Sequence, residues 1–225
     1  MSDPTISFLF DLDGTLVDSV YQHVLAWHEA LQEEGIELSI WRIHRRIGMS
    51  GGLFTNMLFR ETGLEIEAAR IERLRQRHAS AYRALSHQVR PLPGAIDLLA
   101  YLTAAGIPWA IATSGRMETA GPIIEKLGVD PAKTPVITRD KVRYAKPDPD
   151  LFLAAAAALA MPIERACVIG DSVWDMLAAR RAGGLGVGLL SGGYGEDELV
   201  RASAYRVYED PADLLRHIDE VGGRR

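Results

Sequence analysis

The stretch FLFDLDGT, at residues 8–15, decides the fold of this chain of 225 residues. It joins an apolar run without alternation, residues 6–10, to two aspartates, Asp11 and Asp13. Such a run is typical of a strand buried on both faces of a parallel sheet, and ligands bind where parallel strands end. Because extended backbone places residues two apart on the same side, we predict that both carboxylates face one site. A cation is expected there, since it would offset their repulsion.

Two other interpretations of this stretch deserve comparison. Asp-Gly is a common hairpin signal, so a simple turn after the strand is the first alternative. A calcium loop of the EF-hand type is the second, but it requires glycine at its sixth position and glutamate at its twelfth. Counted from Asp11, those positions hold Leu16 and Gln22, which excludes the calcium loop.

Similar apolar runs recur along the chain and alternate with helical patterns. We predict strands at residues 6–10, 109–113 and 167–169, and weaker ones at 186–190 and 205–208. We predict helices at residues 96–105, 118–127, 149–160, 174–182 and 211–221. Several of these helical patterns end at a glycine, as helix C-termini prefer. The alternation predicts an α/β fold with a doubly wound, Rossmann-like parallel sheet.

One long segment interrupts this alternation. Between residues 17 and 90 there is no good strand, only helical patterns near residues 20–34, 52–61 and 67–86. The segment is too long for a single crossover connection of the sheet, and it ends at a turn-rich boundary, residues 91–94. We therefore predict an α/β core made of residues 1–17 and 91–225, with an all-helical domain of residues 18–90 inserted into it.

Other candidate site residues follow the later strands. Thr113 and Ser114 stand before a helix, where hydroxyls and free N–H groups bind anions. Lys146 precedes Pro-Asp-Pro, which stiffens the backbone that presents its charge. Asp171 ends a strand, and Asp175 lies one helical turn further on. Taken singly, each has a simpler explanation: a helix cap, a solvated lysine, or a charge on the helix dipole.

Three strand ends and one loop are together expected to form an anionic crevice. Four carboxylates and one lysine would meet there, and like charges a few ångströms apart repel by several kcal/mol at an effective dielectric constant of about 20. A divalent cation removes this repulsion, and a set of oxygen ligands favours Mg²⁺. The lysine adds the positive charge that admits a phosphate group.

This arrangement resembles the haloacid dehalogenase superfamily, and its phosphatases in particular. The resemblance covers residues 5–17 and 91–210, with all four sequence motifs in order. Residues 18–90 are similar to the small helical cap, of the C1 type, that the family inserts after the first motif. The resemblance therefore implies a cap that selects the substrate and a core that carries out the chemistry.

The resemblance also assigns roles to the core residues. It implies that Asp11 is the nucleophile that forms an aspartyl-phosphate. Asp13 would protonate the leaving oxygen and then activate water. Thr113, Ser114 and Lys146 would bind the phosphoryl group. The implied Mg²⁺ ligands are Asp11, the backbone carbonyl of Asp13, Asp171 and, in support, Asp175.

Within this superfamily, the sequence separates some activities. Dehalogenases lack the second aspartate, which is present here as Asp13. Phosphonoacetaldehyde hydrolases need a cap lysine, but residues 18–90 contain none. We therefore predict a Mg²⁺-dependent phosphatase acting on small phosphate monoesters, similar to phosphoglycolate or to sugar phosphates. A sugar phosphate mutase similar to β-phosphoglucomutase is the alternative, and a non-catalytic binding module on the same fold is the second.

The expected cap offers candidates for substrate selection. Its loop contains Arg45, Arg46, Ser50 and Gly51, whose arginines could bind a carboxylate or a second phosphate and whose glycine permits close approach. The alternative for both arginines is a solvated helix end. Most of the five histidines of this segment are expected at the surface, namely His23, His28, His44, His78 and His87. Trp27 and Trp41 are expected in the apolar core of the cap.

The composition of the chain excludes several classes of binding partner, metal site and cellular location. The formal net charge is −5, too acidic for broad binding of nucleic acid polymers. Cys167 is the single cysteine, which excludes an internal disulfide and a cysteine-rich zinc site. No apolar run approaches the roughly 20 residues of a membrane span, and residues 1–4 do not start a secretory signal. We expect a cytoplasmic protein with a small phosphate ester as its partner, either a monomer or a weak homodimer.

Overall fold

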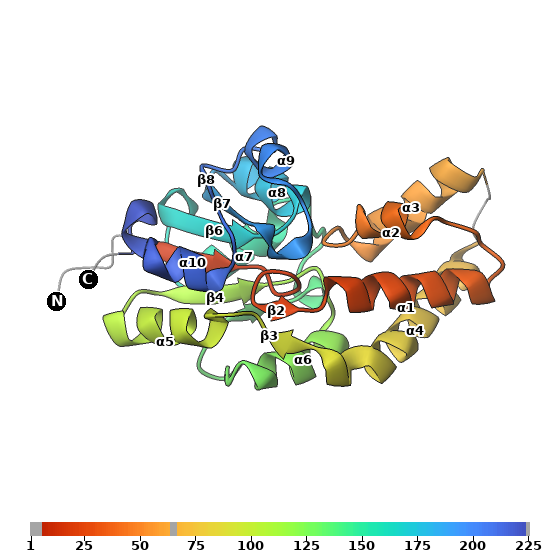
Figure 1. Cartoon of the computed structure of the whole chain (residues 1–225), viewed down its shortest axis with the longest axis horizontal. Coiled ribbons are helices and arrows are strands. Elements are labelled where there is room, and N and C mark those ends of the chain that lie inside the picture. The colour runs from red at the N-terminus through yellow and green to blue at the C-terminus, as the bar shows by residue number, and fades with distance from the viewer. Residues whose placement is uncertain (1–5, 64–66, 224–225) are drawn as a thin grey trace.

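The structure, a computed structural model, describes residues 6–63 and 67–223. Six strands form one parallel sheet in the order β5-β4-β1-β6-β7-β8 (Figure 1). These strands are β1 (Ser7–Phe10), β4 (Trp109–Ala112), β5 (Val136–Ile137), β6 (Ala166–Gly170), β7 (Leu185–Leu189) and β8 (Arg206–Tyr208). The strand order reverses at β1, and such a switch point opens a crevice at the carboxyl edge of the sheet. The predicted doubly wound α/β fold is thereby confirmed.

Helices cover both faces of the sheet because β1 is apolar on both. Phe8 and Phe10 pack on one face with α5 (Ala95–Ala105), α6 (Met117–Lys126) and α10 (Pro211–Arg216). Leu9 points to the other face, which packs against α7 (Asp150–Ala158) and α8 (Val173–Ala182). All four residues of β1 are fully buried. The central strand therefore lies fixed between two apolar layers, and so does the aspartate that follows it.

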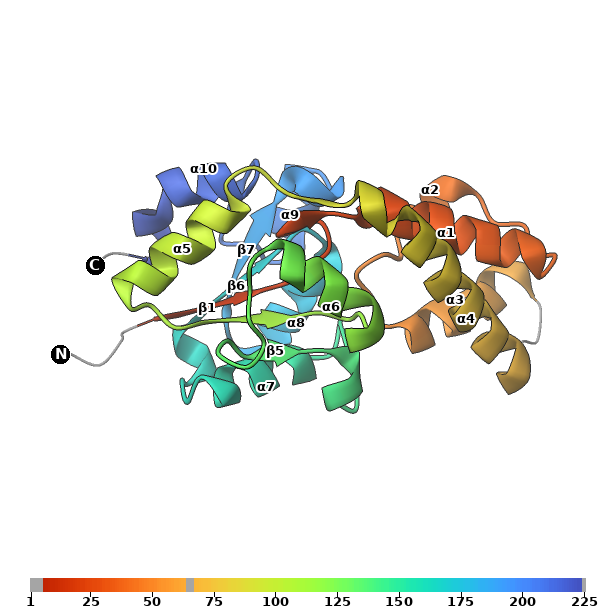
Figure 2. The ribbon, with the colours of Figure 1, turned by 90° about the horizontal axis from the view of Figure 1, so that it is seen from below.

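Four helices lie together beyond one end of the sheet, opposite the two termini (Figure 1 and Figure 2). They are α1 (Val20–Glu33), α2 (Ile40–His44), α3 (Gly51–Thr62) and α4 (Ala68–Leu85). Their apolar side chains form a cluster of their own, which includes Trp27, Leu31, Phe54, Leu58 and Leu74. This separate cluster supports our proposal that residues 18–90 form an inserted helical domain on a core of residues 1–17 and 91–225.

Several short elements were not predicted. β2 (Val17–Asp18) pairs antiparallel with β3 (Arg90–Pro91) where the chain enters and leaves the four helices, although no strand was expected in this segment. β5, α2 and α9 (Glu196–Arg201) were also missed, and the predicted helix at residues 211–221 breaks into α10 and a 3₁₀ turn at Ile218–Val221. Elements of two to six residues are too short to show a periodicity, so only their tertiary contacts define them.

Within residues 6–63 and 67–223, no helix combines the length and the apolar composition that a membrane crossing requires.

Candidate active site

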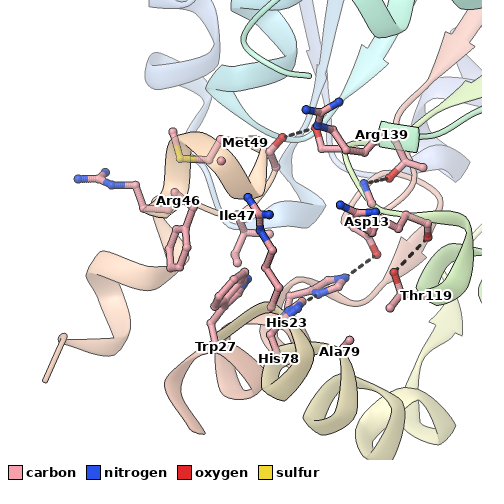
Figure 3. A pocket seen from close by; sticks show the side chains of 18 of the residues that line it. Asp13, His23, Trp27, Arg46, Ile47, Met49, His78, Ala79, Thr119 and Arg139 are labelled. Atoms are coloured by element: carbon pink, nitrogen blue, oxygen red, sulfur yellow. Dashed lines mark hydrogen bonds and ion pairs between the residues drawn. The ribbon is translucent and has the colours of Figure 1, made fainter. Parts of the chain in front are cut away.

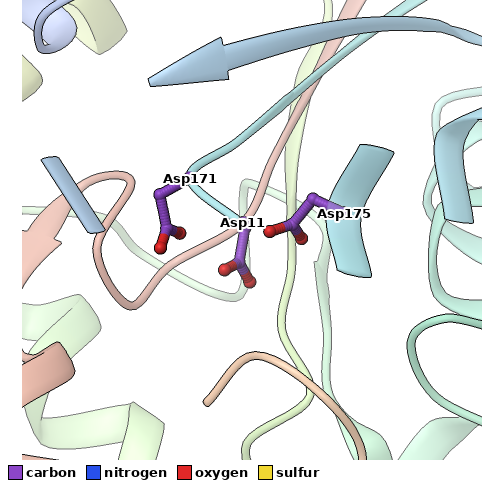
Figure 4. Close-up of side chains that lie close together, drawn as sticks. All are labelled: Asp11, Asp171 and Asp175. Carbon is purple, nitrogen blue, oxygen red and sulfur yellow. The ribbon is translucent and has the colours of Figure 1, made fainter. Parts of the chain in front are cut away.

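Three carboxylates meet at the carboxyl edge of the sheet. Asp11 directly follows β1, Asp171 directly follows β6, and Asp175 lies in the first turn of α8. All three are buried, and one carboxylate oxygen from each lies within 4.8 Å of those from the other two. Figure 4 shows the three side chains pointing toward one another. Residues more than 150 positions apart in the sequence thus form one acidic cluster, because parallel strands end at a common edge.

Lys146 is the cation of this cluster. Its side chain is fully buried, contacts the Asp11 carboxylate, and lies 2.7 Å from Oδ1 of Asp175. Burial alone lowers the pKa of a lysine, but Asp11 and Asp175 outweigh burial and hold the pKa of Lys146 above its ordinary value. Lys146 therefore stays protonated inside the protein.

One lysine does not neutralise three carboxylates. Burial raises the pKa of Asp11 to about 7, although Lys146 opposes the rise, and the neighbouring Asp175 adds to it. Burial, followed by the charges of Asp175 and Asp11, also raises the pKa of Asp171 well above its ordinary value. The protein therefore keeps acidic oxygens together at a cost in free energy, as sites that bind a cation do.

Backbone geometry sets the positions of these carboxylates. Oδ2 of Asp175 accepts a hydrogen bond from the backbone N–H of Ser172 at 3.1 Å, as part of a capping box that starts α8. Oδ1 of Asp171 accepts a hydrogen bond from the Thr15 hydroxyl at 2.9 Å. A Cβ on Gly192 would lie only 1.7 Å from Oδ2 of Asp171, so this glycine makes room for the carboxylate.

Gly192→Ala is therefore expected to displace Asp171 and weaken cation binding by about tenfold or more. Overpacking of this kind also costs about 1–3 kcal/mol of stability. Isothermal titration with Mg²⁺ and urea unfolding measure the two effects. Gly195→Ala is the matched control, because its Cβ would meet Glu198 at an ordinary 3.6 Å. Equal Mg²⁺ affinity in both variants would contradict the role given to this glycine.

The carboxylate of Asp13 contacts Ser19 and His23 and does not join the acidic cluster, so three carboxylates meet there and not the four that the sequence predicted. Its Oδ1 accepts a hydrogen bond from the Ser19 hydroxyl at 2.6 Å and lies 3.2 Å from Nε2 of His23 (Figure 3). Burial raises the pKa of Asp13, but His23 and Ser19 outweigh it and lower the pKa below its ordinary value. The two aspartates of the first motif thus have different surroundings: Asp11 lies among charges, and Asp13 meets the helices.

A cavity of about 230 Å³ lies between the sheet and the four helices. Asp11, Asp13, Thr113 and Ser114 line it from the sheet side. The helices and the loop between α2 and α3 contribute a mixed apolar and cationic wall. It includes His23, Trp27, Arg46, Met49 and His78, which Figure 3 labels, and also Phe54 and Arg75. Oγ1 of Thr113 accepts a hydrogen bond from the backbone N–H of Gly115 at 2.9 Å. Two of the predicted phosphate-binding residues, Thr113 and Ser114, therefore line the cavity with Asp11, whereas Lys146 lies buried behind Asp11 and is not among the lining residues described.

The loop residues predicted to select substrate separate into two groups. Arg46 lines the cavity and forms an ion pair with Glu61. Arg45 is not among the lining residues described; it forms an ion pair with Glu198 of α9, and its guanidinium carbon lies 4.0 Å from the centre of the Tyr194 ring. The sequence did not predict α9, so it held no sign of this partner.

Ser50 and Gly51 stand at the start of α3. The backbone N–H of Ser50 donates to the carbonyl of Lys146 at 3.0 Å, and its hydroxyl accepts from the backbone N–H of Leu53 at 3.3 Å. Ser50 therefore joins the helices to the loop that carries the buried lysine. Gly51 is the first residue of α3, and its surroundings lie outside what the structure describes.

Two expectations about the helical segment were wrong. Most of the five histidines were expected at the surface, but only His87 of them is exposed, and His23 and His78 line the cavity and contact each other. Trp41 is 62% exposed and does not belong to the apolar cluster, whereas Trp27 does. Trp27 faces α3 and α4, which both cover it, whereas α2 is only five residues long and leaves its first turn in solvent.

Comparisons with known proteins agree with this geometry. The family model described as haloacid dehalogenase-like hydrolase matches residues 7–183. Hexitol phosphatase A of Escherichia coli is 34% identical over 78% of this chain and 79% of its own length. Phosphoglycolate phosphatase of Caulobacter vibrioides is 33% identical over 91% of this chain and 87% of its own. A crystal structure of a hydrolase from Pseudomonas syringae is 58% identical, covers 96% of this chain and 98% of its own, and superposes with a TM-score of 0.94.

Proposed function

The chain belongs to the haloacid dehalogenase-like hydrolases, and we propose on that premise that it cleaves small phosphate monoesters with Mg²⁺ through an aspartyl-phosphate. The family and its phosphatase relatives show a phosphomonoesterase of small phosphate esters. The metal, the intermediate and the residue roles are our proposal. One observation supports the proposal most directly: Asp11 lines the cavity, contacts Lys146 and belongs to the acidic cluster.

The proposed reaction has two steps. First, the Asp11 carboxylate attacks phosphorus, the ester P–O bond breaks, and Asp13 gives its proton to the leaving oxygen. Then Asp13 takes a proton from a water molecule that attacks the aspartyl-phosphate, which releases inorganic phosphate and regenerates Asp11. An incoming phosphate brings negative charge next to Asp13, which raises the pKa of its carboxyl toward the protonated form that the first step needs.

Lys146, Thr113 and Ser114 position the phosphoryl group in this proposal. The buried ammonium of Lys146 attracts phosphoryl oxygens and partly neutralises the negative charge of Asp11. The Thr113 hydroxyl and the backbone around Ser114 donate hydrogen bonds from the end of β4. Phosphoryl transfer depends mainly on positioning and charge neutralisation, so these groups supply much of the catalysis.

The acidic cluster fits a divalent cation. Asp11, Asp171 and Asp175 offer buried oxygen ligands, and Lys146 offsets only one of their three charges. We propose that these residues hold Mg²⁺, together with the backbone carbonyl of Asp13, because hard cations of this kind prefer carboxylate and carbonyl oxygens. When bound, the ion supplies positive charge to the carboxylates and to the phosphoryl group.

The free energy of unfolding of the metal-free protein should depend on pH, and a bound cation should reduce that dependence. The pKa of Asp11 is raised from 3.8 to about 7 in the folded, metal-free protein. Between these values the folded state binds more protons than the unfolded state, so the free energy of unfolding falls as the pH rises. We expect the melting temperature of the EDTA-treated protein to fall from about pH 5 to about pH 8, with excess Mg²⁺ restoring most of the loss.

The comparison with Asp11→Asn isolates this contribution. Asparagine does not titrate, so the melting curve of the variant should depend less on pH over the same range. An equally steep loss of stability in the variant would contradict the raised pKa of Asp11.

A product assay tests the activity itself. We expect Mg²⁺-dependent release of inorganic phosphate from a panel of sugar, nucleotide and carboxylate phosphates, whereas a mutase would convert β-glucose 1-phosphate to glucose 6-phosphate without net release. Phosphate release from none of the panel, together with formation of glucose 6-phosphate, would overturn the proposal. The physiological ester, the cytoplasmic location and the oligomeric state remain predictions of the sequence.

A further inference from the structure

Two histidines of the helical segment connect its apolar core to Asp13. Nε2 of His23, on α1, lies 3.2 Å from Oδ1 of Asp13. Nδ1 of the same ring lies 3.1 Å from Nε2 of His78, on α4. Figure 3 shows the three side chains in line, with His78 farthest from Asp13. Residues from two helices and from the loop after β1 thus form one chain of polar contacts along the wall of the cavity.

Aromatic neighbours fix the planes of both imidazole rings. The His23 ring stacks on Tyr82, with centroids 3.8 Å apart and planes inclined by 4°. The His78 ring stacks on Trp27 at 4.2 Å and 17°. Tyr82 and Trp27 are themselves buried, so neither imidazole ring can rotate without disturbing the packing of α1 against α4. The direction of each ring nitrogen is therefore set by the helices.

The protonation of the chain follows from its two ends. Burial lowers the pKa of His78 well below its ordinary value, so His78 is neutral with one N–H. An ionised carboxylate such as Asp13 only accepts hydrogen bonds, so Nε2 of His23 has to donate to it. In the neutral form of His23 that donates from Nε2, Nδ1 carries no proton and can accept the N–H of Nε2 of His78.

We propose that His23 and His78 are positioning residues that fix one oxygen of Asp13 and leave the other for proton transfer. This inference rests on the proposed role of Asp13 in catalysis. The contacts from Ser19 and His23 both go to Oδ1, so Oδ1 is the anchored oxygen. Oδ2 is the oxygen that exchanges the proton with the leaving group and with water. His78 acts one step away, because its N–H selects the tautomer of His23 that points a donor at Asp13.

A different role for His78 makes a different prediction. His78 lines the cavity, so it could instead bind the substrate directly. A direct contact would affect all esters of similar shape alike. A loss of positioning at Asp13 would affect esters in proportion to the basicity of their leaving groups, because only a basic leaving group needs a proton.

The test uses phosphate esters of similar shape and different basicity: 4-nitrophenyl, phenyl and 4-methoxyphenyl phosphate. His78→Phe keeps an aromatic ring for stacking on Trp27 but removes the N–H. We expect its kcat/KM, measured with Mg²⁺, to fall about tenfold for the phenyl and methoxyphenyl esters. For the nitrophenyl ester, the fall should be no more than about twofold. His78→Gln retains an N–H donor and should recover most of the loss. His87→Phe, at an exposed position, is the control.

Each outcome decides the matter. Equal losses across the three esters, or no loss, would overturn the positioning role of His78. So would a failure of His78→Gln to recover activity that His78→Phe has lost. Asp13→Asn, measured in parallel, separates the proposed catalytic role of Asp13 from the positioning role of His78. If its loss of kcat/KM does not depend on the leaving group, the proposed role of Asp13 is wrong. If Asp13→Asn shows the dependence and His78→Phe does not, only the present inference fails.

A measurement on the unaltered protein covers the case in which His78→Phe does not fold. Nitrogen-15 NMR of histidine-labelled protein distinguishes the two neutral tautomers, and the spectrum of His23→Gln assigns the His23 signals. We expect His23 to carry its proton on Nε2, with Nδ1 accepting a hydrogen bond. A proton on Nδ1 of His23, in the neutral ring or in the cation, would overturn the proposed chain of donors.

Discussion

Asp11→Asn is expected to abolish phosphatase turnover while the fold persists. The amide has no anionic oxygen to attack phosphorus, so we expect hydrolysis of 4-nitrophenyl phosphate to fall by at least about 10³-fold. The shape of the side chain is retained. Because burial raises the pKa of Asp11, replacing its charge should leave the metal-free protein as stable as the wild type or more so. Steady-state kinetics with Mg²⁺ and thermal unfolding measure the two effects.

The intermediate provides a second readout for the same variant. Mass spectrometry of acid-quenched reactions should find a phosphoryl group on the peptide that contains Asp11 in the wild type and none in the variant. Asp197→Asn is the control, since that side chain is 87% exposed and is not among the residues that line the cavity. Wild-type turnover in Asp11→Asn would show that another group is the nucleophile.

Lys146→Met is expected to reduce both activity and stability. The lysine is fully buried and contacts Asp11 and Asp175, so its removal leaves two buried carboxylates without their cation. Breaking a buried ion pair in this way costs about 3–5 kcal/mol. Loss of the positive charge that meets the phosphoryl group should lower kcat by about 10²–10³-fold. Urea unfolding in EDTA and kinetics in Mg²⁺ measure these quantities.

Added Mg²⁺ should return part of the stability of Lys146→Met, because a bound cation offsets the same carboxylates. Lys133→Met is the control, since its side chain is 83% exposed and its ion pair with Asp130 should contribute less than about 1 kcal/mol. An unfolding midpoint in EDTA equal to that of the wild type would show that Lys146 does not hold the acidic cluster together.

Contacts local to a strand end were predictable from the sequence. Asp11 comes directly after a buried apolar run, and parallel strands end at a common edge, so its meeting with Asp171 followed from the order of the elements. Lys146 also contacts Asp11, in agreement with the expectation that one lysine meets the carboxylates. The elements that the sequence missed, such as β2, β5 and α9, have no more than six residues each.

Contacts between distant helices were not predictable in this way. His23 and His78 are 55 residues apart, and nothing in their spacing indicates that α1 and α4 bring their rings together. Arg45 and Glu198 are 153 residues apart and meet through a helix that the sequence did not predict. Trp27 lies in a predicted helix and Trp41 in α2, which the sequence missed; both were expected in the apolar core, and only the packing between the helices decides that the first is buried and the second exposed.

The sequence by itself determined the α/β class and the order of its main strands and helices, and it predicted the carboxylates and hydroxyls at the strand ends and the lysine in a loop. An apolar run and the polar residues that end it are neighbours in the sequence. They can therefore be recognised without knowledge of the tertiary contacts. Only the tertiary structure decided which oxygen of Asp13 is held, which arginine lines the cavity and which histidines leave the surface. Those outcomes depend on side-chain packing between helices, whose register and crossing the periodicity of a single helix does not specify.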